Sequence, residues 1–309
     1  QYGADGVRVG MLLCSPAGND LLFDESLTEQ GRNFGNKIWN AFRLVKSWKV
    51  DQNAAQPEHS REAVEWFAHR LNKAIEELDA QYDQFRLSEA LMNLYRLFWD
   101  DFSSWYLEIV KPAYQSPIDP ATLESTLDFF EKLMKLLHPI MPFITEEIYQ
   151  LIRERDEGDS IMISPAPGQG SWDNNQLDVF EKMKQLITSV RNIRKDKEIP
   201  NKEELELKVN GEHASRFDPI VRKLANVSSI EKISGKMDNT LSFMVRTTEY
   251  YIPVGELVDA ESEIQKLEEE LEYTKGFLQS VLKNLNNQRF VQNAPEKVVN
   301  LEKQKKEDA

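Results

Sequence analysis

A short basic stretch near the start of this chain has the residue types needed to contact phosphate. Between Gly31 and Val50 the sequence carries five Lys or Arg residues and no Asp or Glu, although the formal net charge of the chain is -14. Four aromatic residues are interleaved with these cations: Phe34, Trp39, Phe42 and Trp48. Because cations attract phosphate and flat rings stack on unpaired bases, the stretch predicts a local docking face for nucleic acid. The alternative is a basic helix that only covers a hydrophobic core.

Helical geometry divides this stretch into two faces. At about 100° per residue, one face is apolar and predicts contact with a core. Its members are Phe34, Ile38, Ala41, Val45 and Trp48. The opposite face is polar and holds Arg32, Asn36, Asn40, Arg43 and Lys46. Trp39 lies on the polar side, where its ring either packs under a neighbouring helix or offers a surface for an unstacked base.

Residues that could form a catalytic or metal site are few. The single cysteine, Cys14, excludes an intramolecular disulfide and a cysteine-based zinc site, and the four histidines lack metal-ligand spacing. Adjacent carboxylates such as Glu146 and Glu147 point in different directions on a helix, and no phosphate-binding loop or nucleophile motif is present. We therefore predict no catalytic residue, no metal and no cofactor. The lone cysteine and the lack of an apolar run near ~20 residues fit a cytoplasmic protein outside the membrane.

The elements that must hold the basic stretch are mostly helices. Apolar residues recur with helical spacing over 26–155, with breaks near 51–57, 82–83, 111–120 and 138–142. The pattern predicts a mainly α fold with a helical bundle. Residues 158–172 predict a surface connector, and another helix is expected over 176–197. After Pro200 the period changes to alternation, which predicts a small α+β unit with a thin core.

The last segment predicts a coiled coil. A leucine or isoleucine recurs every seven residues from Leu257 to Leu285. Pro295 then fits the first turn of a second helix, so an antiparallel hairpin is the simplest arrangement. The second arm is the shorter one, which indicates either truncation or a seam that binds the bundle or a second copy of the chain. The chain also begins without Met inside an expected helix, so we expect a piece of a longer protein.

Several motifs resemble one protein family. Residues 2–8 (YGADGVR), 32–40 (RNFGNKIWN), 98–108 (FWDDFSSWYLE) and 138–148 (HPIMPFITEEI) are similar to the region after the catalytic domain in class I aminoacyl-tRNA synthetases of the valine, isoleucine and leucine group. Residues 287–296 (NQRFVQNAPE), in a C-terminal hairpin, resemble the valyl-tRNA synthetases of that group.

The resemblance implies a domain order and a partner. Residues 1–25 would be the remnant of the connector after the catalytic domain, 26–200 the anticodon-binding bundle, 201–254 the small α+β domain and 255–309 a tRNA-binding arm. The whole enzyme would join valine to its tRNA with ATP, whereas this piece, without the catalytic and editing domains, would not. The implied partner is the tRNA specific for valine, bound by a monomer; a dimer through the truncated coiled coil is the other arrangement considered.

The site residues follow from the basic stretch and the resemblance together. The family contacts the anticodon with an arginine followed by an aromatic residue; Arg43 fits this pattern and Leu44 departs from it. The arm would place its own contacts near the D and T loops. The residues expected to bind tRNA are Arg32, Asn36, Trp39, Asn40, Arg43, Leu44, Lys46, Lys283, Arg289 and Phe290.

The charge of the arm agrees with this placement only in part. Glu256 to Ser280 holds eight acidic and two basic residues, whereas Val281 to Ala309 holds six basic and four acidic ones. Positive charge therefore rises toward the hairpin tip and the second helix, where RNA would be met. Ordinary charged flanks of a coiled coil would give the same pattern. The alternative function is thus a coiled-coil assembly module without RNA specificity.

Overall fold

The computed structural model describes residues 1–15, 23–253, 271–272, 274–279 and 281–283. They fall into two compact units, one formed by Gln1–Lys236 with Ser242–Ile252 and the other by Met237–Leu241 with Pro253–Ala309. The residues described after 270 are helical. Most of the predicted coiled-coil hairpin lies outside the described residues. Within the described ranges, no helix is both long and apolar enough to cross a membrane.

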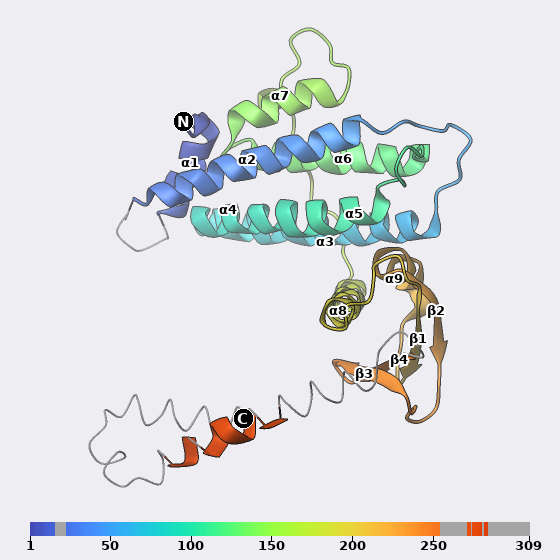
Figure 1. Ribbon diagram of the computed structural model, residues 1–309. Helices are drawn as coiled ribbons and strands as arrows, with labels where there is room; N and C mark the ends of the chain where they lie inside the picture. Colours follow the sequence, from blue (N-terminus) through green and yellow to red (C-terminus); the bar gives the residue numbers. More distant parts are fainter. Residues whose placement is uncertain (16–22, 254–270, 273, 280, 284–309) are drawn as a thin grey trace. The chain divides into compact units, whose positions relative to one another are not determined.

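A helical bundle forms most of the compact unit made by Gln1–Lys236 with Ser242–Ile252. This confirms the mainly α prediction. Its elements are α1 (Gly3–Leu13), α2 (Glu25–Lys46), α3 (Glu58–Asp83), α4 (Leu87–Arg96), η1 (Leu97–Tyr106), α5 (Leu107–Val110), α6 (Pro120–Leu137) and α7 (Pro142–Ile152). The elements α4, η1 and α5 form one continuous rod. Figure 1 shows α2 lying between α7 on one side and this rod on the other. The predicted breaks fall at or between the ends of the observed helices.

Local signals determine where several helices begin. At the start of α2, a side-chain oxygen of Asp24 accepts a hydrogen bond from the Ser26 amide at 2.9 Å. Asp119 accepts one from the Thr122 amide at 2.8 Å at the start of α6. Pro120 opens the same helix, where the missing N–H costs little because that donor has no partner within a helix. Capping residues and prolines therefore explain why the sequence located these boundaries correctly.

Aromatic rings fill the centre of the bundle. Phe34 of α2 meets Phe98 of η1 edge to face, with ring centroids 5.9 Å apart. Phe130 of α6 contacts both Phe98 and Phe102, at centroid distances of 5.7 and 5.4 Å. All four rings are fully buried. Edge-on ring contacts add stability beyond the apolar area that they bury. They hold one side of α2 against η1 and α6, so the opposite side of α2 is left to face solvent.

The rod from α4 to α5 departs from a regular α-helix. Its middle element, η1, is a π-helix, in which hydrogen bonds span five residues instead of four. The helical spacing of the sequence predicted no break here, and at regular α-helical spacing Trp105 falls on the same face as Phe98 and Phe102. The wider turn changes which residues face the core. Tyr106 is fully buried with its hydroxyl 2.8 Å from Thr126 Oγ1, whereas Trp105 is half-buried, with Lys184 Nζ 5.8 Å from its ring centroid.

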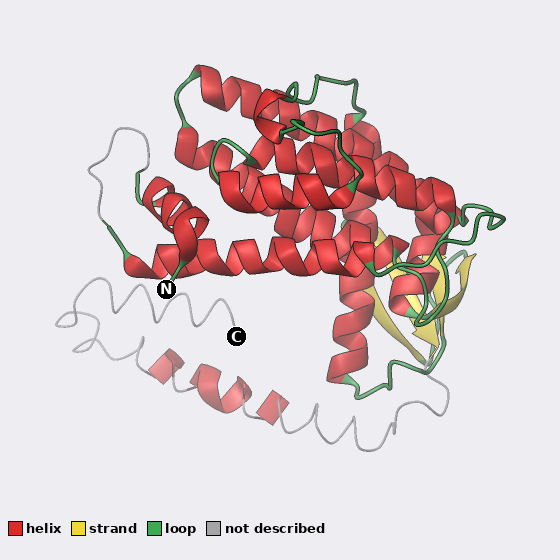
Figure 2. Cartoon of the chain, turned by 90° about the horizontal axis from the view of Figure 1, so that it is seen from above, coloured by secondary structure: helices red, strands yellow, loops and turns green. Residues whose placement is uncertain are grey.

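The small α+β unit follows the connector, which contains η2 (Ile161–Ile163), and the helix α8 (Asn174–Asp196). Its strands are β1 (Leu205–Asn210), β2 (Val227–Lys232), β3 (Thr240–Val245) and β4 (Thr248–Pro253), with η3 (Ser215–Phe217) and α9 (Asp218–Ala225) between β1 and β2. The strand order is β2-β1-β4-β3, with β1 parallel to β2 and antiparallel to β4. Figure 2 shows the strands gathered in one place beside the helices.

Strand β2 lacks the alternation that marks strands after Pro200, and the register explains why. Its apolar residues Val227 and Ile230 are three positions apart, which breaks the alternation expected of a strand. In the sheet, Val227 pairs with Leu205 and Ile230 pairs with Leu207, because the register shifts between Leu205 and Glu206. This shift lets both apolar residues of β2 lie opposite apolar residues of β1.

Charged and aromatic contacts connect the α+β unit to the bundle. Arg216 forms an ion pair with Glu62 of α3 and a second with Glu65, whose oxygen lies 2.6 Å from Nη2. The ring of Phe217 meets Phe180 of α8 edge to face, at a centroid distance of 5.2 Å. The unit thus obtains from α3 and α8 part of the packing that its own core lacks.

The crossing of α1 and α2 depends on glycine. A Cβ atom at Gly31 of α2 would lie 2.4 Å from the carbonyl oxygen of Gly6 and 2.9 Å from Val9 Cβ. We expect Gly31→Ala to lower the free energy of unfolding by about 1–3 kcal/mol, because the two helices would have to move apart. Urea denaturation of the chain, followed by far-UV circular dichroism, measures this change.

The matched control is Gly35→Ala on the same helix. There the nearest atoms to an added Cβ, from Met141 and Ile144, are 3.7 and 3.8 Å away. These are ordinary contact distances, so alanine should raise stability by roughly 0.5–1 kcal/mol through its better helix propensity. An equal loss of stability in both variants would show that the crossing does not depend on Gly31.

Candidate nucleic-acid interface

The polar side of α2 faces solvent. Asn36, Asn40, Arg43 and Lys46 are all exposed, and we call this row of side chains the α2 ridge. The apolar side that the sequence predicted is buried or half-buried, and Phe42, which that prediction omitted, is buried as well. Arg43 is therefore accessible to a macromolecule that approaches the bundle from outside.

The cations of α2 differ in the contacts that they make within the protein. Arg32 is only half-exposed, and its Nη2 lies 2.7 Å from Glu29 Oε1 and its guanidinium over the ring of Tyr2. Lys46 donates from Nζ to the carbonyl oxygen of Leu151 at 3.0 Å, in the last turn of α7. Arg43 forms no ion pair with any residue that the structure describes. The positive charge available to a ligand is thus concentrated at Arg43.

Trp39 and Leu44 lie on different flanks of Arg43. The half-buried ring of Trp39 packs against Phe42 at a centroid distance of 5.5 Å. Leu44 follows Trp39 by five positions, which is about 140° round the helix, so the two side chains lie on opposite flanks of Arg43. Leu44 itself is 38% exposed. The two side chains therefore face different neighbours along α2.

A second aromatic group lies on the flank of Leu44, and the sequence reasoning did not select it. Lys37 precedes Leu44 by seven positions and shares its side of α2. The Lys37 Nζ atom lies 5.1 Å from the ring centroid of Trp99 in η1, and that ring stacks on Tyr95 at 5.4 Å. Trp99 is half-buried. A large ring outside the apolar stripe, the same signal that drew attention to Trp39, could have identified it.

The three predicted arm residues are only partly described. Lys283 is helical and exposed. Arg289 and Phe290 lie outside the described residues. The role of all three in RNA binding stays a prediction.

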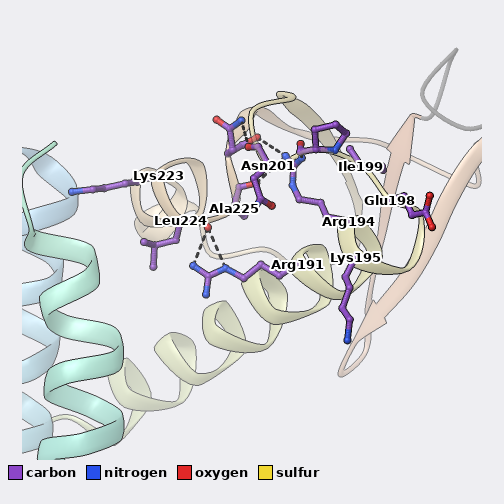
Figure 3. Close-up of a pocket in the computed structure, with 11 residues that line it drawn as sticks. Arg191, Arg194, Lys195, Glu198, Ile199, Asn201, Lys223, Leu224 and Ala225 are labelled. Carbon is purple, nitrogen blue, oxygen red and sulfur yellow. Dashed lines mark hydrogen bonds between the residues drawn. The ribbon is translucent and has the colours of Figure 1, made fainter. Parts of the chain in front are cut away.

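A large cavity in the α+β unit is rich in cations, yet its geometry argues against a ligand site. It has a volume of about 850 Å³ and lies between the C-terminal ends of α8 and α9. Arg191 donates from Nε and Nη2 to the carbonyl oxygen of Leu224, as Figure 3 shows. In the same view Lys195 and Lys223 point in different directions. The cations of this cavity do not converge on a common ligand position.

Arg194, in the wall of that cavity, has a structural role. It is 3% exposed, and its Nη2 donates to the carbonyl oxygens of Glu203, Ala225 and Asn226 at 2.8 to 3.1 Å. Its Nη1 donates to the carbonyl oxygen of Pro200. A buried guanidinium thereby binds carbonyl groups at the C-terminal end of α9 and in the loop before β1.

Lys223 ties α9 to the end of α5. Its Nζ donates to the carbonyl oxygens of Ile109 and Lys111, at 2.6 and 3.0 Å, and lies 3.0 Å from His59 Nε2. Burial, together with the neighbouring Lys223 ammonium, lowers the pKa of His59 to about 4. The imidazole is therefore neutral at pH 7 and accepts the hydrogen bond from Lys223.

Comparisons with known proteins match the whole chain. The family described as "Anticodon-binding domain of tRNA ligase" matches residues 64–209, and the "Valyl tRNA synthetase tRNA binding arm" matches residues 259–309. The α2 ridge precedes the first of these segments, and η1 lies inside it.

Three relatives show how closely the chain resembles full-length enzymes. It is 56% identical to the valine–tRNA ligase of Parabacteroides distasonis and 54% identical to that of Phocaeicola vulgatus, in each case over 100% of this chain and 35% of the relative. The valine–tRNA ligase of Thermotoga maritima is 28% identical over 99% of this chain and 36% of its own length. The chain thus spans about a third of the length of the curated relatives that it matches.

The low pKa of His59 predicts a pH-dependent stability. Between about pH 6.5 and 4 the unfolded chain binds a proton at His59 and the folded chain does not. The free energy of unfolding should therefore fall as the pH is lowered through this window, with no further contribution from His59 below it. Urea titrations at several pH values measure this loss.

His59→Gln is the matched variant, because its amide oxygen can still accept the hydrogen bond from Lys223 while the side chain does not titrate. Carboxylates contribute to acid sensitivity in both proteins, so the difference between the two curves isolates His59. Parallel curves from pH 7 to pH 4 would contradict the lowered pKa.

Proposed function

Because the chain belongs to the valine–tRNA ligase family and corresponds to the C-terminal region of its members, we propose that it is the tRNA-holding part of such an enzyme. The α2 ridge contacts the anticodon loop of the tRNA specific for valine. The arm at 255–309 contacts the outer corner of the same tRNA. In the whole protein, which works in the cytoplasm, this binding orients the tRNA for an ATP-dependent reaction that joins valine to it.

One observation carries the proposal for the described residues. Arg43 is exposed at the C-terminal end of α2 and forms no ion pair within the described structure, in a chain whose formal net charge is -14. Arg43 lies beside the neutral amides of Asn36 and Asn40 and can approach a phosphate or a base edge without first breaking a contact that the structure describes. Asparagine side chains both donate and accept hydrogen bonds, as reading a base requires.

RNA binding is favoured over a coiled-coil assembly module without RNA specificity. Residues 259–309 match an arm described as tRNA-binding, and most of the bundle matches an anticodon-binding domain. An assembly module would not need an exposed arginine on α2 that forms no ion pair with the described residues. We therefore propose that the chain binds tRNA as a monomer.

Arg43→Ala tests anticodon reading. We expect the variant to bind the valine-specific anticodon stem-loop about tenfold more weakly, because a charged contact to a base or phosphate is lost. The loss should be smaller for stem-loops with other anticodons. Fluorescence anisotropy with labelled stem-loops at two salt concentrations measures both effects.

Arg86→Ala provides the control for charge alone. Arg86 is also exposed, with Nη1 3.4 Å from Glu89, but it lies between α3 and α4. Its removal should leave stem-loop affinity nearly unchanged. An equal loss for every stem-loop in the Arg43 variant would make Arg43 a plain phosphate contact and would contradict anticodon reading.

Leu44→Phe tests the flank of Arg43 on which the base stacks. An aromatic ring at this partly exposed position should strengthen stem-loop binding about fivefold, because bases stack better on a ring than on an aliphatic side chain. Trp39→Leu, on the other flank, should change stability through its contact with Phe42 and leave affinity nearly unchanged. The same anisotropy assay checks both variants, and the reverse pattern would place the stacked base beside Trp39.

A further inference from the structure

Tyr114 is a conspicuous exposed aromatic residue outside the α2 ridge. Its side chain lies in the loop between α5 and α6 and is 92% exposed. Because both faces of its ring are open to water, the packing of the core does not explain the position of this tyrosine. Single exposed apolar residues are common, so the surroundings of Tyr114 decide whether the exposure has a use.

The loop that carries Tyr114 is fastened beside the C-terminal end of α2. Val50 and Ile118 form an isolated parallel bridge. The Ile118 amide donates to the carbonyl oxygen of Lys49 at 2.8 Å, and the Asp51 amide donates to that of Ile118 at 3.0 Å. Arg43 lies in the last turn of the same helix. The open ring is therefore carried by a loop that is hydrogen-bonded to the residues that follow α2.

An apolar cavity of about 500 Å³ opens next to Tyr114. This volume lies within the range of roughly 300–1,000 Å³ that is typical of small-ligand sites. The cavity is therefore large enough to hold a single nucleobase. Prolines and alanines dominate its wall: Ala54, Ala55, Pro57, Pro112, Ala113 and Pro117. Rigid, apolar walls suit the face of a planar ring. Polar groups of His59, Ser60 and Ser116 also line the cavity and could meet the edge of that ring.

Positive charge surrounds this cavity. Lys111 and Lys223 both line it, and Lys49 is exposed beside the bridge. Burial and the nearby Lys111 ammonium lower the pKa of Lys223 to about 8. Lys223 is held by the carbonyl oxygens of Ile109 and Lys111, so Lys111 and Lys49 are the cations that can meet an incoming anion. Glu108, 2.5 Å from Lys111 Nζ, offsets part of this charge.

Among the described residues that line this cavity, Asp119 is the only carboxylate. It is buried, with 4% exposed, and its side chain already caps α6 by accepting from the Thr122 amide. The negative charge of Asp119 therefore stabilises the N-terminus of α6, and this contact shields it from an incoming phosphate.

We propose that Tyr114 and the adjoining cavity bind one unstacked nucleobase from the loop of the tRNA held on the α2 ridge. The base stacks on the phenol ring and enters the cavity, and its phosphate faces Lys49 and Lys111. The inference rests on the proposed function and adds a base-binding site to it. An aromatic platform beside cations is the arrangement by which proteins hold splayed bases of single-stranded RNA.

The test substitutes Tyr114 in the 309-residue chain and measures binding of the valine-specific anticodon stem-loop by fluorescence anisotropy. Tyr114→Ala should bind about tenfold more weakly, and Tyr114→Trp should bind as well as the parent chain, because stacking needs a ring and not a hydroxyl. Since the side chain is almost fully exposed, neither change should disturb folding, which circular dichroism checks.

Phe85→Ala is the matched control. Phe85 is 83% exposed and lies beyond the other end of α3 from His59. The 26 residues of that helix separate the two ends by about 39 Å. Loss of this equally exposed ring should leave affinity unchanged. A similar loss in the Phe85 variant would mean that exposed rings act nonspecifically and would overturn the inference.

A fluorescent base supplies an independent readout. 2-Aminopurine is placed at each loop position of the stem-loop in turn, since stacking on an aromatic side chain quenches its emission. At one position the parent chain should quench it and Tyr114→Ala should not. Quenching that is identical in both proteins at every position would overturn the inference.

The outcomes separate this inference from the proposed function. If Arg43→Ala weakens binding while Tyr114→Ala does not, the second base site is wrong and the tRNA-holding role stands. If the parent chain does not bind the stem-loop at low salt, both the second base site and the tRNA-holding role are wrong.

Discussion

The burial of one side of α2 is the constraint on which the rest of this structure depends. Phe34 and its neighbours enter a centre of aromatic rings contributed by η1 and α6. A helix has two sides, so fixing the apolar one in the core fixes the direction of the other. The glycine crossing with α1 holds the start of the same helix in place. The α2 ridge is exposed because the core leaves it no other direction.

The Lys and Arg residues of this chain serve both the stability of the fold and the binding of a ligand. In this acidic chain, Arg194, Arg191 and Lys223 are used to satisfy carbonyl groups, many of them near helix ends. A positively lined cavity therefore does not by itself indicate a ligand. Arg43 differs because no described group uses its charge, and we regard this difference as the more informative sign of a binding role. The cavity near Tyr114 differs from the larger one in the α+β unit in another way, because it adjoins an open aromatic ring.

The proposed interface is assembled from segments far apart in the chain. The bridge between Val50 and Ile118 brings the loop of Tyr114 to the end of α2. The contact between Lys37 and Trp99 places η1 along its flank. The wide turns of η1 decide which of its aromatic residues are buried and which, like Trp99, stay partly accessible. A surface made in this way can be continuous over several nucleotides although no single motif encodes it.

The sequence by itself determined the helical bundle, the breaks between its helices, the change to strands after Pro200 and the polar side of α2, because periodicity, caps and prolines act over a few residues. It also carried the family resemblance. Only the tertiary structure decided that Trp39 and Leu44 face different neighbours, that Arg32 is paired while Arg43 has no ion pair among the described residues, and that β2 joins the sheet through a shifted register. These outcomes depend on which elements pack together, and the spacing of residues along one helix or strand holds no information about its neighbours.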